Sequence, residues 1–118
     1  MNQDIARHFA TIVTTAFPKH ADVAPTEEDG DLCLYFDWHL RNDPERPNKR
    51  SKIILVRISR EAISDYANRD NEQRTRADAL LKGFLADRMT ALDPQPAAPA
   101  HIVSTPEEWL IETGLINL

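Results

Sequence analysis

The residues best suited to binding in this chain are cations gathered in one short stretch. Between Arg41 and Arg60 there are seven basic residues and two acidic ones, Asp43 and Glu45. The basic residues are Arg41, Arg46, Lys49, Arg50, Lys52, Arg57 and Arg60. The rest of the chain holds the other seven of 14 basic residues and the other seventeen of 19 acidic residues. This basic island on an acidic chain is a place where a negatively charged partner could dock.

Four of these cations are expected at the tip of a long hairpin loop over 41–52, where Asn42, Pro44 and Pro47 are turn-forming residues. The four are Arg46, Lys49, Arg50 and Lys52. Such a loop resembles in outline the wing with which some winged-helix proteins contact a phosphate backbone. The acidic remainder of the chain would repel a polyanion, and a charged turn also protects a hairpin from aggregation. The loop is therefore either a docking site or a protective turn.

A second set of polar residues alternates along a predicted strand over 32–40, because side chains alternate between the two faces of a strand. One face carries Leu32, Leu34, Phe36, Trp38 and Leu40. The other face carries Cys33, Tyr35, Asp37 and His39. If helices cover one side of the sheet, this second face stays open as a dimer or ligand face. There Tyr35, His39 and Arg57 could converge on a small anion.

These residues do not complete a catalytic or metal-binding motif. Asp37 and His39 supply two ligands, whereas a bound metal needs three or four. Cys33 lies in an apolar strand, which raises the pKa of a thiol and makes it unreactive. The chain has three glycines and no glycine-rich phosphate loop. We therefore expect no catalytic residue, no cofactor, no metal and no enzymatic activity.

The first half of the chain shows the periodicity of one helix and two strands. Apolar residues at helical spacing predict an amphipathic helix over 4–16. Residues 19–31 carry a proline, a glycine and an acidic run, and are interpreted as a loop with a short irregular strand near Val23. Strands are predicted over 32–40 and over 53–58, the second being rich in β-branched residues.

The second half of the chain begins with apolar residues at helical spacing, and this periodicity ends at position 92. Ser59 can cap a helix whose apolar residues continue to position 92, and polar residues over 68–71 predict a kink or short break in this 60–92 segment. Three prolines and three alanines lie in the segment over 93–104, which predicts an extended arm. Within that arm, 102–103 could add an edge strand.

The end of the chain has the pattern of a capped helix over 105–113. Thr105 can cap it, Pro106 suits its first position and Gly114 can end it. Trp109 and the apolar residues around it are too much nonpolar surface to leave in water. The predicted helix packs either on its own chain or on a second subunit, so Trp109 is a candidate for the dimer face.

Composition completes the prediction of the fold. Apolar residues make up 42% and charged residues 28% of the chain, values typical of a folded domain. We expect a single α+β domain over 1–118, in which a small antiparallel sheet packs against amphipathic helices in the order helix, strand, strand, helix, helix, extended arm, helix. No apolar run is long enough to span a membrane, and the single cysteine fits a reducing cytoplasm.

The function expected from these features is non-enzymatic. A cytoplasmic interaction or regulatory module, forming a homodimer and binding a protein partner through complementary charge, fits the basic island best. Nucleic-acid binding through the loop over 41–52 is the alternative. An enzyme acting on a small anion at Tyr35, His39 and Arg57 ranks third.

Overall fold

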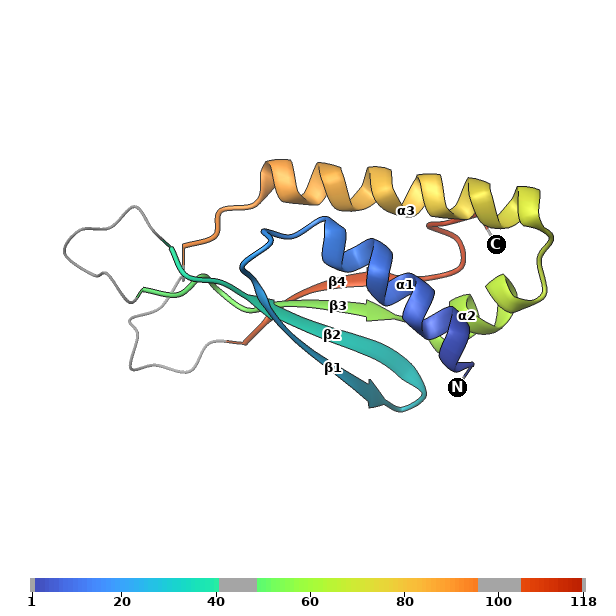
Figure 1. The fold of residues 1–118 in the computed structure, drawn as a ribbon, viewed down its shortest axis with the longest axis horizontal. Coiled ribbons are helices and arrows are strands. Elements are labelled where there is room, and N and C mark those ends of the chain that lie inside the picture. Colours follow the sequence, from blue (N-terminus) through green and yellow to red (C-terminus); the bar gives the residue numbers. More distant parts are fainter. Residues whose placement is uncertain (1, 41–48, 96–104, 118) are drawn as a thin grey trace.

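The computed structural model describes residues 2–40, 49–95 and 105–117 (Figure 1). Its elements are α1 (Gln3–Thr15), β1 (Asp22–Glu28), β2 (Asp31–Asp37), β3 (Ile54–Ile58), α2 (Arg60–Ala67), α3 (Asn71–Ala91) and β4 (Glu107–Ile111). The strands form one sheet in the order β1-β2-β3-β4, and α1 and α3 cover one of its faces. This arrangement confirms the predicted α+β class.

Side-chain caps set the limits of the helices between β3 and β4. The Ser59 hydroxyl accepts the backbone N–H of Ala62 at 3.1 Å and so begins α2. Asp70 and Gln73 form a capping box that begins α3, the Asp70 carboxylate accepting the Gln73 N–H at 2.8 Å. The predicted break in the 60–92 segment is therefore confirmed.

β1 and β2 form an antiparallel hairpin: the short strand expected near Val23 is present, but it is regular and extends to Glu28, which corrects the loop predicted for the rest of 19–31. Asp29 and Gly30 join the strands with φ angles of 56° and 84°. Positive φ at both central residues is typical of the two-residue turn whose twist matches paired strands, and Asp-Gly is a favoured sequence for it. The sequence pattern hid β1 because nearly all its side chains are exposed, so no alternation of apolar and polar residues marks it.

Pro25 lies at the centre of β1, opposite Leu34 in an uninterrupted ladder. Proline has no N–H, so inside a paired strand it is tolerated where its nitrogen points away from the neighbour. The nitrogen of Pro25 therefore points to the outer edge of β1, beside which the described residues place no further strand. A missing donor at the middle of an edge protects that edge from strand addition.

The predicted strand over 32–40 is regular to Asp37, where β2 ends. Beyond it, His39 forms an isolated bridge with Arg50, and the Leu40 N–H donates to the Lys49 carbonyl at 2.8 Å. The hairpin arms thus stay paired up to the segment 41–48, which lies outside the described residues.

The predicted helix over 105–113 is wrong, because this segment forms β4, which pairs parallel to β3. Trp109 lies opposite Val56, and both Trp109 and Ile111 are buried. These two residues are two positions apart, the spacing of one strand face, and their burial outweighs the local preference for a capped helix. The sheet is consequently mixed rather than antiparallel. The edge strand suggested for 102–103 lies outside the described residues.

The core lies between the sheet and the helices. The rings of Phe17 and Phe36 are stacked with centroids 3.9 Å apart, and the Trp109 ring lies 5.6 Å from that of Phe17. Trp109 is 1% exposed, and its indole N–H donates to the Glu107 carboxylate at 2.7 Å. Trp109 therefore belongs to the core of its own chain and is not part of an exposed dimer or ligand face.

Candidate functional site

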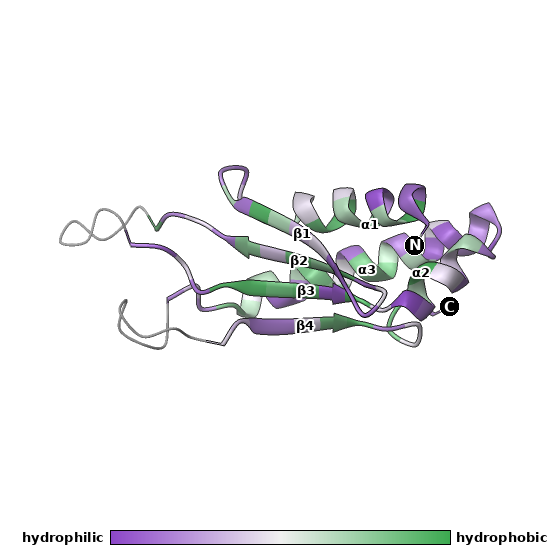
Figure 2. Cartoon of the chain, turned by 90° about the horizontal axis from the view of Figure 1, so that it is seen from below, coloured by the Kyte–Doolittle hydropathy of each residue, from purple (hydrophilic) through white to green (hydrophobic). Residues whose placement is uncertain are grey.

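The face of the sheet opposite α1 and α3 is not covered by any described helix (Figure 2). Alternation along the strands turns residues such as Leu34 and Val56 toward the helices and their neighbours to the other side. We name this other side the open face. Its residues are Asp22, Ala24, Thr26, Glu28, Asp31, Cys33, Tyr35, Asp37, Leu55, Arg57, Glu108 and Leu110. Tyr35 and Asp37 lie where the alternation predicted, whereas His39 lies beyond the end of β2.

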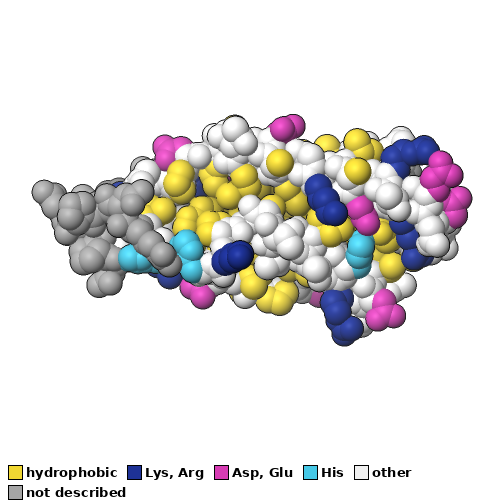
Figure 3. All heavy atoms as spheres, turned by 45° about the horizontal axis from the view of Figure 1, so that its top comes forward, with side chains coloured by type: hydrophobic (Ala, Val, Ile, Leu, Met, Phe, Trp, Pro, Cys, Tyr) yellow, Lys and Arg dark blue, Asp and Glu magenta, His cyan; other side chains and the backbone are white. Residues whose placement is uncertain are grey.

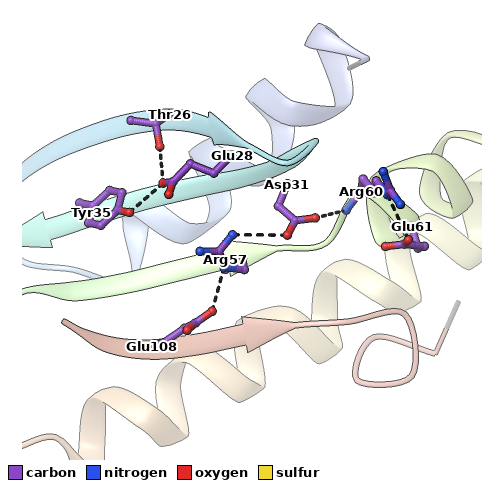
Figure 4. A network of polar contacts seen from close by, with 8 residues as sticks. All are labelled: Thr26, Glu28, Asp31, Tyr35, Arg57, Arg60, Glu61 and Glu108. Carbon is purple, nitrogen blue, oxygen red and sulfur yellow. Dashed lines mark hydrogen bonds and ion pairs between the residues drawn. The ribbon is translucent and has the colours of Figure 1, made fainter. Parts of the chain in front are cut away.

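Arg57 links three strands across the open face (Figure 4). Its Nε donates to the Glu108 carboxylate at 2.8 Å and its Nη1 lies 3.4 Å from the Asp31 carboxylate. Asp31 also accepts the backbone N–H of Arg60 at 2.9 Å. The hydrogen bond to Glu108 raises the pKa of the Arg57 guanidinium, so this group stays a cation between two carboxylates.

A second polar group on the open face centres on Glu28 (Figure 4). One oxygen of its carboxylate accepts the Tyr35 hydroxyl at 2.7 Å and the Thr26 hydroxyl at 2.8 Å. These hydrogen bonds, that of Tyr35 first, lower the pKa of Glu28. The same bond raises the pKa of Tyr35, because the phenol must keep its proton to donate. Tyr35 is thus held as a donor to a carboxylate.

Replacing Tyr35 with phenylalanine should raise the pKa of Glu28 toward its ordinary value of 4.5. Because the folded-state pKa of Glu28 is lowered, its contribution to stability is present above pH 4.5 and is lost as pH falls through the folded value. The variant should lose this pH-dependent contribution. Carbon-detected NMR titration of the Glu28 carboxyl measures the shift. Thr26→Ala, which removes the weaker donor, should change the pKa less, and an equal change would contradict the assigned order.

The described cations of the predicted docking loop contact carboxylates of their own chain. Arg50 donates to Asp37 at 3.0 Å and also to Asp22, and so ties β1 to β2. Lys52 Nζ lies 3.5 Å from a carboxylate oxygen of Glu107. Lys49 joins the backbone pairing described above, and Arg46 lies outside the described residues. The structure therefore gives Arg50 and Lys52 an internal role in neutralising nearby acids.

The acidic excess of the protein lies in its sheet. Residues 22–37, 49–58 and 107–112 hold nine acidic and four basic residues, a difference of −5 that equals the net charge of the whole chain. Six of these acids lie between Asp22 and Asp37, where there is no lysine or arginine. The other described residues hold eight of each sign. Figure 3 shows both signs interspersed on the helix side.

The open face carries neither a reactive thiol nor, among the described residues, a metal-binding cluster. Cys33 is fully buried, and burial raises the pKa of its thiol to about 11, which keeps it protonated and unreactive. In the part of the chain that the structure describes, no group of three or more histidine, cysteine or acidic side chains is placed to hold a metal ion. Tyr35 and Arg57 do share the open face, but each is bound to a carboxylate rather than directed at a common point.

The structure also brings together three polar residues that sequence analysis did not connect. Tyr66 on α2 donates to Asp78 on α3 at 2.9 Å, and His8 on α1 lies 2.8 Å from the Tyr66 hydroxyl and 3.0 Å from Asp78. Burial, followed by the bond to Asp78, raises the pKa of Tyr66. The cluster joins the three helices. No local pattern marks it, because its members are up to 70 positions apart.

The fold and the open face define a class: a two-layer α+β protein with one acidic sheet surface that no helix of the described residues covers. Comparison with models of known families, with curated proteins and with solved structures finds no match. Among the helices that the structure describes, none has the length and nonpolar character needed to cross a bilayer.

Proposed function

We propose that this chain is a non-enzymatic interaction module whose open face binds a basic segment of a protein partner. The observation that supports this best is the charge of the open face, whose carboxylates outnumber its cations: it holds Asp22, Glu28, Asp31, Asp37 and Glu108 against Arg50 and Arg57. A surface of one sign attracts and orients a partner of the opposite sign. Leu110, 44% exposed on the open face, adds nonpolar surface to the contact.

Complementary charge is again the basis of the proposed contact, as expected from the sequence, but the docking surface of this chain is acidic rather than basic. The basic stretch supports docking less well, because its described cations Arg50 and Lys52 are outnumbered by the carboxylates that they contact, those of Asp22, Asp37 and Glu107. Nucleic-acid binding through the loop over 41–52 stays the alternative, and its measurement is salt-sensitive binding of a mixed-sequence DNA or RNA fragment. The cytoplasm stays the predicted compartment.

A second copy of the chain suits the open face less well than a basic partner. Two copies related by a two-fold axis would bring two acidic surfaces together, and like charges oppose such a contact. A homodimer, if formed, would need another surface. Light scattering at low and high salt measures it, because a dimer held through the open face would strengthen as salt screens the repulsion.

Neutralising the open face should weaken partner binding. In the double variant Glu28→Gln, Glu108→Gln two carboxylates become amides of the same shape, so the attraction of these two side chains for a basic partner is lost. Capture from cell extract by the immobilised protein, quantified by mass spectrometry, should show a set of proteins retained about tenfold less by this variant. That set should be basic in isoelectric point and should elute with salt.

The matched control neutralises two exposed carboxylates on α3, Glu72→Gln and Asp87→Asn. This control should retain the same proteins as the wild type. Equal losses for both double variants, or a lost set that is acidic, would contradict binding through the open face. Salt-sensitive binding of nucleic acid that disappears in Arg46→Ala, Lys49→Ala, Arg50→Ala, Lys52→Ala would place the basic loop first.

A further inference from the structure

The two edges of the sheet differ in their capacity to accept another strand. The edge formed by β1 lacks a donor at its centre, where the nitrogen of Pro25 points outward. The edge formed by β4 has no proline between Glu107 and Ile111. The described residues place no strand beyond β4 (Figure 2). As far as the described residues show, the β4 edge is therefore open to pairing while the β1 edge is obstructed by Pro25.

The hydrogen bonds between β3 and β4 show which backbone groups of β4 are unused by the sheet. The Glu107 N–H donates to the Ile53 carbonyl at 2.9 Å, and the Ile111 carbonyl accepts the Ser59 N–H at 3.0 Å. Backbone groups alternate in direction along a strand, so Glu107, Trp109 and Ile111 direct theirs toward β3. The N–H and carbonyl groups of Glu108 and Leu110 consequently point outward.

The side chains beside these outward groups indicate what kind of strand would pair there. Leu110 lies 44% exposed on the open face, next to the strand position of Arg57. Three carboxylates accompany it, those of Glu107, Glu108 and Glu112, against the two cations Lys52 and Arg57 that already contact Glu107 and Glu108. An incoming strand would therefore gain from nonpolar residues against Leu110 and from basic residues against the acids.

We propose that the partner's basic segment binds in extended form as a fifth strand on the free edge of β4. This inference rests on the proposed function for the charge of the partner, and it adds the binding mode and the place. The occupant is a segment in which nonpolar and basic residues alternate, because side chains of an added strand alternate between the open face and the helix side. A second copy is the poorer occupant, since two β4 strands side by side would bring four glutamates together.

A synthetic peptide in which valine and lysine alternate tests the binding mode directly. In the nitrogen-15 NMR spectrum of the full chain, the peptide should shift the amide signals of Glu108 and Leu110 and slow their hydrogen exchange. The amides of Val23 and Glu27 on the β1 edge should stay unchanged. A valine and glutamate peptide should not bind. Shifts concentrated on β1 or on the helices would overturn the proposal.

The variant Leu110→Pro removes the one outward donor at this position without removing a hydrogen bond to β3. It should weaken peptide binding by about tenfold, whereas Leu110→Val should bind as the wild type does. Because a proline could also disturb folding, binding to the unsubstituted protein is measured as well. The peptide used there carries N-methyl groups on alternate backbone amides. Loss of binding with this peptide supports strand addition, and equal binding by both peptides overturns it.

Failure of this inference is distinguishable from failure of the proposed function. If capture of basic proteins depends on Glu28 and Glu108 while Leu110→Pro captures the same set, the function stands and the strand addition is wrong. If no basic protein depends on the open face, both are wrong. A concentration-dependent dimer that Leu110→Pro dissociates would identify a second copy as the occupant and overturn the partner proposed here.

Discussion

Replacing Trp109 with alanine is expected to lower the free energy of unfolding by about 3–5 kcal/mol. The indole is buried between Phe17 and Val56, so its removal loses nonpolar burial and leaves a cavity in the core. The Glu107 carboxylate also loses the indole N–H that it accepts. Urea or guanidinium unfolding followed by circular dichroism gives the change.

The adjacent residue supplies the matched control for this prediction. Leu110 lies on the same strand but on the open face, where it is 44% exposed. Leu110→Ala should change the free energy of unfolding by about 0.5 kcal/mol, as expected of a surface position. Similar effects at positions 109 and 110 would contradict a strand with one buried face.

Replacing Asp78 with alanine should destabilise the fold by about 1–3 kcal/mol. The Tyr66 hydroxyl is buried and donates to Asp78, so the variant leaves this donor with His8 alone as a partner. It also removes the carboxylate that His8 contacts, which weakens the junction of α1 with α3. Thermal and denaturant unfolding measure the loss.

Asp87→Ala is the control, since Asp87 is exposed on the same helix. A double-mutant cycle of Asp78→Ala with Tyr66→Phe then isolates their interaction. Once Tyr66 has lost its hydroxyl, removing Asp78 should cost less, because the shared hydrogen bond is already absent. Additive effects would show that Asp78 acts independently of Tyr66.

The helices and the two central strands of this fold are predictable from the sequence because burial leaves a periodic pattern. The apolar positions of α1 recur at helical spacing, and Ser59 and Asp70 cap the two later helices. β2 and β3 show alternating or continuous apolar residues. In each case the local pattern and the tertiary packing favour the same element.

The edge strands were mispredicted, each for its own reason. β1 is exposed on both faces, so beyond the short strand expected near Val23 its proline, glycine and acidic residues predict a loop. In β4, Thr105 and Pro106 have the pattern of a helix start, yet pairing with β3 and burial of Trp109 decide the structure. Propensity is a weak guide where tertiary contacts compete with it.

The open face was predicted in part. Alternation placed Tyr35 and Asp37 on one side of β2, and the structure places them there with Arg57. The carboxylates that bind Tyr35 and Arg57 were not predicted, because Glu28 and Glu108 lie on the two misassigned strands. The His8 and Asp78 contact was beyond prediction, since it follows from helix packing and not from any local spacing.

The parallel pairing of β3 and β4 has a consequence for how the protein acquires its structure during synthesis. Val56 and Trp109 face each other although they are 53 positions apart, so the ribosome must make α2 and α3 before β3 finds its second neighbour. Until then β3 exposes a hydrogen-bonding edge and the aromatic core is incomplete. The local helices can form early, whereas ordering the intervening chain delays the final pairing. The growing polypeptide is therefore most prone to misassociation through β3 just before β4 emerges.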